Sequence, residues 1–450
     1  METIKEFKGL WWLPEDLENQ VAGTLIVKNN KMVLETIGMV GSDSPIDHFI
    51  GGNVPQYDVI WGVLSDSKEV SVFNCYESMS FNTDCPFPVA KYNVQVVAVG
   101  KHIQSLDELG NYDVKAYIEE LSYWFSPNII QISQQDKNFT FSVDLKNANQ
   151  IVVTLDDGCK LELEGEVNIK HGKTGMQVTI NQMSTLSFAC SKPISMNDAK
   201  RNVFLFEQFL SFATLTPVQC DRFLLIEKDK DGNPASNNTI EIFEKKDERS
   251  NDPGRFWEFL FVYETIKDSF SSIICKWYEE KDMFPIRAHL IDSIGHRGSF
   301  CGNDFLIVVQ AVEGYYCRFK KDGLSLKFIL RNLIEEFSDI TIMEITDHDI
   351  ECIVDSRHYY SHLLPKGKKP NVVDGKELYN LNHKLRKLLL CCILEFVGFS
   401  NGEINSIFSK SHNSYLRMIS GEKREFNDEE PQNITGEVLS TTQISEAIQE

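Results

Sequence analysis

The feature that most constrains how this chain can fold is a change in its hydrophobic period near residue 256. Before that point, short β-type runs are separated by turn-forming residues. After it, apolar residues recur at intervals of three and four, as on one face of a helix. Strands followed by helices favour an α+β fold over the alternating units of a parallel sheet. The sequence therefore predicts a β-rich N-terminal part, sandwich- or barrel-like, followed by a compact helical bundle.

Hairpin signals mark the strands of the first part. Residues 22–37 form two apolar-rich runs around the polar segment 28–31. A second pair of runs, in residues 151–163, flanks Asp157-Gly158, and a D-G pair tolerates the positive φ that tight hairpins require. Four further short β-type runs lie in residues 59–64, 70–75, 93–99 and 139–143. A helix over residues 198–214 and a long hairpin over residues 222–243 are also predicted.

Helices with an apolar stripe are predicted over residues 305–319, over residues 326–337 and from Thr346 onward. A longer one is expected to begin after the cap residue Asp374, with Glu377 three residues later completing a capping box. Gly398 is expected to end it, because glycine readily adopts the left-handed conformation of a helix C-cap. Residues 421–450, with eight acidic and two basic side chains, are predicted to form a disordered acidic tail.

Charge and composition exclude several classes of protein. The chain has 450 residues and a formal net charge of −21, which argues against a broad basic surface for nucleic acid. The longest apolar run, residues 388–394, is far shorter than the roughly 20 residues of a membrane span. The N-terminus has no apolar segment behind a basic one, so a signal peptide is not expected. We therefore expect a cytoplasmic protein that does not enter a membrane.

The 11 cysteines lead to the same expectation. They include no CxxC pair, and neither zinc sites nor disulfide frameworks are expected without recurring short spacings. Most of the cysteines are therefore predicted to be reduced, small core residues of an intracellular protein.

The segment 355–362, Asp-Ser-Arg-His-Tyr-Tyr-Ser-His, carries the most informative polar residues. Arg357 continues the stripe of Ile350 and Ile353, so its guanidinium is expected to be buried. There it needs an acid, a neighbouring subunit or a bound phosphate as partner. On an ideal helix His362 lies about 140° away from Arg357, which makes a site on one helix awkward. Two copies related by a dyad would remove that difficulty.

Two other interpretations of this segment stay open on spacing alone. His358 and His362 lie four residues apart with Asp355 on the same face, an arrangement that is able to bind a metal. The simpler alternative is a polar, solvent-exposed helix end without function.

A resemblance favours a third interpretation. Arg-His-Tyr-Tyr-Ser-His fits the R-x4-6-H signature of the HEPN ribonucleases, and its flanking segments are similar to the HEPN domain of ApeA-type anti-phage proteins. Segments near the N-terminus resemble the ApeA N-terminal domain. The resembling segments are GLWWLP (9–14), VAGTLIV (21–27), SKPISMNDAKRNVFLFEQFLSFAT (191–214), FLIVVQAVEGYYCRF (305–319) and GKELYNLNHKLRKLLLCCILEFVGFS (375–400).

The resemblance implies a metal-independent endoribonuclease without a cofactor, in which Arg357 and His362 are the catalytic pair and His358 supports them. It implies cleavage of tRNA or mRNA in abortive infection, a homodimer formed through the all-α HEPN bundle, and a phage-derived trigger protein. The runner-up is a catalytically silent HEPN-type module that binds nucleotide, RNA or a protein partner. The domains implied are an ApeA-like sensing domain over residues 1–285, a HEPN domain over residues 286–420 and the tail over residues 421–450.

Further residues are candidates for supporting roles. Glu313 is one step off the apolar stripe of its helix and is able to pair with Arg357; the alternative is a solvated boundary residue. Between residues 366 and 387 there are seven basic residues and two acidic ones, so Lys366, Lys368 and Lys369 are predicted to contact RNA phosphates. A solvated loop next to one helix face explains the same charges equally well.

Overall fold

The computed structural model describes most of the chain between residues 4 and 416. The described ranges are residues 4–28, 31–41, 56–77, 89–107, 111–127, 129–135, 138–144, 150–171, 177–228, 234–245, 258–279, 281–295, 302–340, 344–363, 365–411, 413 and 416. The predicted tail over residues 421–450 lies outside them. Strands dominate as far as residue 244 and helices from residue 263 onward, as the change of period predicts.

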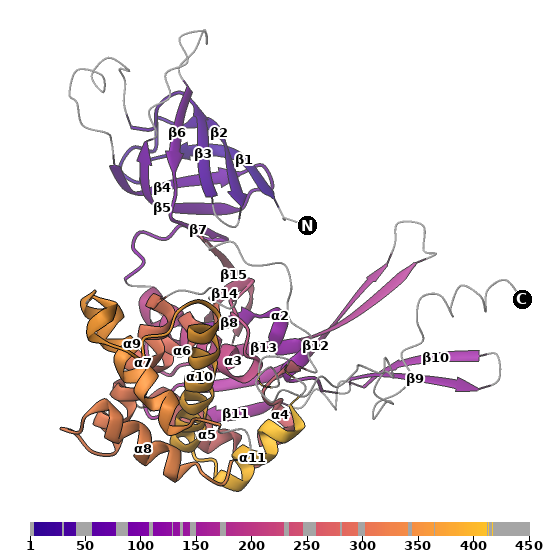
Figure 1. The fold of residues 1–450 in the computed structure, drawn as a ribbon. Coiled ribbons are helices and arrows are strands. Elements are labelled where there is room, and N and C mark those ends of the chain that lie inside the picture. Colours follow the sequence, from indigo (N-terminus) through magenta and orange to yellow (C-terminus); the bar gives the residue numbers. More distant parts are fainter. Residues whose placement is uncertain are drawn as a thin grey trace, which may run out of the picture.

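The N-terminal strands close into a barrel, drawn in indigo in Figure 1. Around the barrel the order is β1-β2-β3-β6-β5-β4 and back to β1, with every neighbouring pair antiparallel. The side chains that fill it include Trp11, Leu25, Leu34, Ile60 and Val72, all fully buried. The strands are β1 (Lys5–Trp12), β2 (Val21–Lys28), β3 (Lys31–Ile37), β4 (Gln56–Leu64), β5 (Glu69–Glu77) and β6 (Val89–Asn93).

Strand β5 links the barrel to a second group of strands. One end of β5 pairs with β6, and the stretch Val70–Phe73 pairs with β7 instead. From β7 the sheet continues through β15, β14, β8, β13 and β12 to β11. These strands are β7 (Val96–Val99), β8 (Tyr112–Tyr117), β11 (Ile151–Thr154), β12 (Lys160–His171), β13 (Val178–Ala189), β14 (Arg222–Lys228) and β15 (Pro234–Glu244).

Two hairpins project from the body of the molecule (Figure 1). One is the far half of β12 and β13, which are paired along twelve residues. The other is a separate two-stranded sheet made by β9 (Ile130–Gln135) and β10 (Asn138–Val143).

The helices pack against the second group of strands and against one another (Figure 1). Helices α7, α8 and α9 fall where the apolar spacing predicts them, and α3 covers the predicted residues 198–214. The helical elements are α2 (Glu119–Trp124), α3 (Met196–Thr214), α4 (Tyr263–Ile266), α5 (Phe270–Glu279), η3 (Lys281–Met283), α6 (Phe284–Gly295), α7 (Gly302–Phe319), α8 (Leu326–Glu336), α9 (Asp347–His362), η4 (Lys366–Lys368), α10 (Gly375–Val397) and α11 (Asn401–Lys410).

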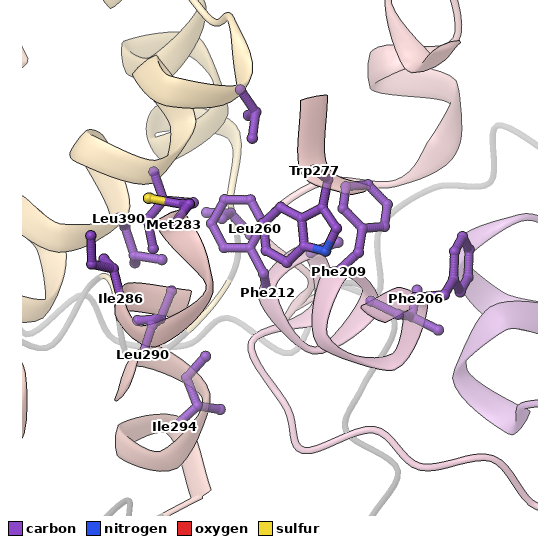
Figure 2. Packing of buried hydrophobic residues seen from close by; sticks show 14 of the residues in the cluster. Phe206, Phe209, Phe212, Leu260, Trp277, Met283, Ile286, Leu290, Ile294 and Leu390 are labelled. Carbon is purple, nitrogen blue, oxygen red and sulfur yellow. The ribbon is translucent and has the colours of Figure 1, made fainter. Parts of the chain in front are cut away.

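One hydrophobic core runs through the strands outside the barrel and through the helices. In Figure 2, Phe209 and Phe212 of α3 lie beside Trp277 of α5, and Leu390 of α10 lies near Ile286 of α6. The rings of Phe212 and Trp277 stack, with centroids 5.6 Å apart. The same cluster contains residues on both sides of position 285, whereas the barrel has a core of its own. The helical bundle is therefore built onto the second group of strands.

Two local expectations need correction. Asp374 does precede α10, but its side chain makes no capping hydrogen bond, so the predicted capping box is absent. Gly398 ends α10 as predicted, with φ of 114°. Cys159 and Cys190, expected to be reduced, are joined by a disulfide with their Cα atoms 4.3 Å apart. Cys159 follows the D-G turn and directly precedes β12, and the pairing of β12 with β13 brings it beside Cys190. The spacing of the cysteines in the sequence gave no indication of this proximity.

None of the described helices is both long and apolar enough to span a membrane.

Candidate active site

Helix α9 carries the Arg-His segment and is fixed at both ends. At its start the Thr346 hydroxyl accepts a hydrogen bond from the Asp349 backbone N–H at 3.2 Å, and the Asp349 carboxylate accepts one from the Thr346 N–H at 2.7 Å. This is a capping box. Lys384 of α10 donates to the same carboxylate at 2.8 Å, which ties the two helices together. Leu363, in the left-handed conformation with φ of 49°, ends the helix directly after His362.

The buried face of α9 differs from the predicted one. Ile350 and Ile353 are buried as expected, but Ser356 takes the next buried position in place of Arg357. The Ser356 hydroxyl accepts a hydrogen bond from the Val373 N–H at 3.2 Å. A residue three positions after Ile353 lies as near the stripe as one four positions after it, and here the smaller side chain is inside.

Arg357 is therefore at the edge of the buried face and is partly exposed. Its Nη2 lies 3.5 Å from Oε2 of Glu313 on α7, and the two side chains are 30% and 29% exposed. Glu313, which the sequence suggested as a partner of Arg357, therefore does pair with it. Water still reaches the pair, so part of the guanidinium surface remains accessible to an anion.

The two histidines of the segment lie next to each other. The rings of His358 and His362 have centroids 6.1 Å apart. Nδ1 of His358 is 3.2 Å from the Val354 carbonyl oxygen, which orients that ring. His362 is exposed in the last turn of the helix. The His362 imidazole is thus open to solvent within this chain.

Asp355, the third member of the possible metal site, is used elsewhere. Its Oδ2 accepts hydrogen bonds from the Asn371 N–H and from Asn371 Nδ2, at 3.3 and 3.0 Å. Its Oδ1 lies 3.3 Å from the Lys369 ammonium group. Within the described ranges no group of three or more His, Cys, Asp or Glu residues is arranged to hold a metal ion. Asp355 instead fastens the loop that follows α9.

The basic stretch after the motif does not form one surface. Lys369 pairs with Asp355, and Lys384 pairs with Asp349. Arg386 is buried, donating to Asp304 of α7 and to Ser293 of α6. Lys387 is also buried.

Burial lowers the pKa of Lys387, because it penalises the charged form, although Glu344 opposes the effect. Lys368 and Lys376 are exposed, and the side chain of Lys366 lies outside what the structure describes. The stretch therefore offers fewer charges to RNA than its sequence suggests.

Sequence reasoning missed the contacts that hold the loop against the motif helix. Besides Ser356, Tyr360 anchors the loop by donating from its hydroxyl to the Val373 carbonyl oxygen at 3.1 Å. The Tyr360 ring also lies so close to Gly302 that a Cβ there would be 2.5 Å from it. No local pattern identifies these partners, which are 13 or more residues away in sequence.

Two family matches cover most of the chain. Residues 6–277 match the family described as ApeA N-terminal domain 1, and residues 306–403 match the family described as Apea-like HEPN. The second match contains Glu313, Arg357 and His362. No curated protein matches the chain, and no solved structure does.

Proposed function

Because the chain belongs to the ApeA N-terminal domain 1 family and carries an Apea-like HEPN domain, we propose that it is an anti-phage endoribonuclease whose catalytic residues are Arg357 and His362. The observation that supports this most is the position of the two side chains on α9. Arg357 is charged and partly exposed, and His362 is exposed one turn and a half later. Neither side chain is buried in the core.

The proposed chemistry uses these two side chains and the RNA itself. The 2′-hydroxyl attacks the adjacent phosphorus while an imidazole accepts its proton. The bond to the 5′-oxygen then breaks, and a proton is returned to that oxygen. The products are a 2′,3′-cyclic phosphate and a free 5′-hydroxyl. An unperturbed imidazole titrates at about pH 6.5, so it can accept and donate protons near pH 7.

Arg357 has a different role in this proposal. The pentacoordinate phosphorane carries more negative charge than the ground state, and a guanidinium fork is able to bind two of its oxygens together. Glu313 holds the fork on the α7 side of the helix. His358, whose ring is oriented by the Val354 carbonyl, is placed to support His362.

We further propose that two chains assemble through their HEPN domains in a homodimer. The sequence suggested that a buried Arg357 could need a neighbouring subunit as its partner. That reason for a dimer is wrong, because Arg357 is partly exposed and pairs with Glu313 of the same chain. Other features support the dimer. Arg357 is directed to α7 while His362 is at the open helix end, and Leu363 beside it is 83% exposed. A two-fold contact at this end would cover that leucine and bring both motifs together.

The deciding experiment compares RNA ends from cells that express the protein with those from cells that express His362→Ala or Arg357→Ala. Each variant should lose cleavage by about 100-fold or more, the range typical of a missing acid–base or phosphate-binding group. Arg222→Ala and His171→Ala are matched controls, since both residues are exposed and lie outside α9, and Arg222, like Arg357, pairs with a glutamate. Unchanged cleavage by either motif variant would reject the proposed pair.

A second arm tests the independence from metal. Cleavage by the purified protein should persist in excess EDTA, because the proposed steps need no Lewis acid. If cleavage disappears in chelator and returns with Zn²⁺ or Mg²⁺, the Arg–His mechanism is wrong. If the protein binds RNA but never cleaves it, the silent binding module is the better description. The proposal also includes a tRNA or mRNA substrate, a phage-derived trigger and a cytoplasmic location. Mapping the cleaved RNA in infected cells tests which of the two RNAs is the substrate.

A further inference from the structure

A cavity of about 660 Å³ lies between α3, the β14–β15 hairpin and residues 278–287. Its volume is within the roughly 300–1,000 Å³ that small-molecule sites occupy. Helix α9 contributes nothing to its lining, so the cavity is separate from the candidate active site. Most of the lining belongs to the part of the chain that matches the ApeA N-terminal domain, and the rest lies between the two family matches.

The walls of the cavity are positively charged in a chain of net charge −21. The acidic residues among them are Glu207 and Glu244, and both are engaged. Glu244 pairs with Lys200, and Glu207 accepts a hydrogen bond from the Cys220 N–H at 2.5 Å. The basic residues are Lys200, Arg201, Lys245, Lys281 and Arg287.

Three of these cations are available to a ligand. Within the described ranges, Arg201, Lys245 and Lys281 pair with no carboxylate, and all three are exposed at the cavity. Like charges gathered without counter-ions repel one another, and a bound anion would relieve that repulsion. A ligand for this cavity should therefore carry several negative charges.

The cavity also has an aromatic side. Phe204 and Phe284 line it and are 46% and 40% exposed. Their centroids are 6.4 Å apart and their planes are inclined by 55°. Deeper in the wall, Arg287 is buried with its guanidinium 4.4 Å from the Trp277 ring, which belongs to the core shown in Figure 2. This part of the wall is therefore continuous with the packed core.

We propose that this cavity binds a nucleotide. A flat heterocycle would contact Phe204 and Phe284, and its phosphates would meet Arg201, Lys245 and Lys281. A nucleotide would use both halves of the lining. Inorganic phosphate has no ring to contact the phenylalanines, and a nucleoside has no negative charge to pair with the cations. Helix α6 lines the cavity with Phe284 and Arg287. The same helix packs against α7, where Ile286 lies near Gly314, the neighbour of Glu313.

The test is calorimetric titration of the full chain with ATP, GTP, CTP and UTP, and with adenosine and tripolyphosphate as partial ligands. At least one nucleotide should bind at one site per chain, more weakly as salt is raised. Adenosine and tripolyphosphate should each bind at least about tenfold more weakly than the best nucleotide, because each lacks one half of the interaction. No binding of any nucleotide at millimolar concentration would overturn the proposal.

Variants locate the site. Phe284→Ala, and separately Arg201→Gln with Lys281→Gln, should each weaken binding by about tenfold, in line with the loss of a stacking or phosphate contact. Phe328→Ala and Lys321→Gln are matched controls, because both residues are exposed and lie outside the cavity. Both variants should bind the nucleotide as the unaltered chain does.

Arg357→Ala should also bind normally. If it alone loses binding, the nucleotide occupies the α9 site and the cavity assignment is wrong. Binding shown only by RNA oligonucleotides, and by none of the nucleotides, would overturn it as well. Because the readout is heat of binding, the outcome is independent of whether the chain cleaves RNA.

Discussion

The guanidinium of Arg357 and the carboxylate of Glu313 are 3.5 Å apart and both partly exposed. A pair of this kind contributes little to stability, about 0–1 kcal/mol, because water screens it. Its larger effect is geometric, since it restrains a long side chain that otherwise samples many rotamers. Glu313 is therefore a positioning residue in the proposed reaction.

Glu313→Gln should leave folding nearly unchanged and slow RNA cleavage by about tenfold, because a less restrained Arg357 binds the phosphorane less well. The maximal rate should fall more than the affinity for RNA. Steady-state cleavage and thermal unfolding of the same preparation measure both effects. Glu335→Gln, an exposed acid on α8, is the control. A large loss of stability with normal cleavage per folded molecule would assign Glu313 a purely structural role.

Asp349 offers a test of the contact between α9 and α10. Burial alone raises the pKa of this carboxyl, but the hydrogen bonds from Lys384 and Thr346 outweigh it, and the pKa lies below its usual 3.8. A lowered folded-state pKa means that the stabilisation is complete above the unfolded-state value and is lost as pH falls through the folded-state one.

Asp349→Asn should therefore lower the free energy of unfolding by about 1 kcal/mol at neutral pH. The difference from the unaltered chain should stay constant between pH 7 and pH 5 and narrow only below about pH 3.8. Denaturant titrations at three pH values measure it. Asp339→Asn, on an exposed residue, should show no such difference. A difference that already shrinks between pH 7 and pH 5 would contradict the assignment.

At the scale of elements, α9 and the loop after it form one unit. Asp355, Ser356 and Tyr360 on the helix each hold the loop between residues 369 and 373. Lys369 belongs to this fastening, so its charge is already compensated. The RNA-binding role predicted for the stretch then falls mainly on the residues of η4.

Replacing Lys366 and Lys368 together with Gln should weaken RNA binding and reduce the slope of log affinity against log salt by about 1.4, since each of the two lost phosphate contacts on single-stranded RNA removes about 0.7. Folding should be unaffected, because the helix-to-loop contacts remain. Binding isotherms at several salt concentrations give the slope. The double variant Lys321→Gln with Lys410→Gln removes two exposed charges elsewhere and is the control. An unchanged slope would mean that the η4 lysines do not contact phosphates.

At the scale of the whole molecule, the helical bundle and the strands outside the barrel share one core, and the barrel has its own. Within this core α6 packs against both α3 and α7. The barrel is joined to the rest by the pairing of β5 with β7 and by contacts of Lys5 and Phe7 on β1 with Glu241 and Phe243 on β15.

The proposed dimer predicts complementation between two inactive proteins. If one active site takes Arg357 from one chain and His362 from its partner, a mixture of Arg357→Ala and His362→Ala should recover roughly a quarter of normal cleavage after subunit exchange, because half the dimers are mixed and each has one intact site. Activity per chain should also fall on dilution as the measured mass falls. Full activity in a sample shown to be monomeric, with no complementation, would reject the shared site.

The sequence by itself determined the class of fold and the positions of the main helices. Local preferences and the burial of one face account for the change of period at residue 256 and for the apolar stripes of α7 and α8. They also account for the start of α9 at Thr346 and for the end of α10 at Gly398. Such preferences depend on near neighbours in the chain. The Arg-His segment was identified through a resemblance, which also depends on a local pattern, and its catalytic role stays a prediction.

Only the tertiary structure decided which polar groups meet. Ser356 rather than Arg357 is buried, Asp355 holds the loop through Asn371, Arg386 lies inside against Asp304, and Cys159 is joined to Cys190 across a hairpin. Each of these outcomes depends on partners that are 16 to 82 residues away in sequence. Hydrophobic spacing sets which side of an element turns inward, but a hydrogen bond or ion pair forms only after distant elements are packed, and local spacing contains no information on that distance.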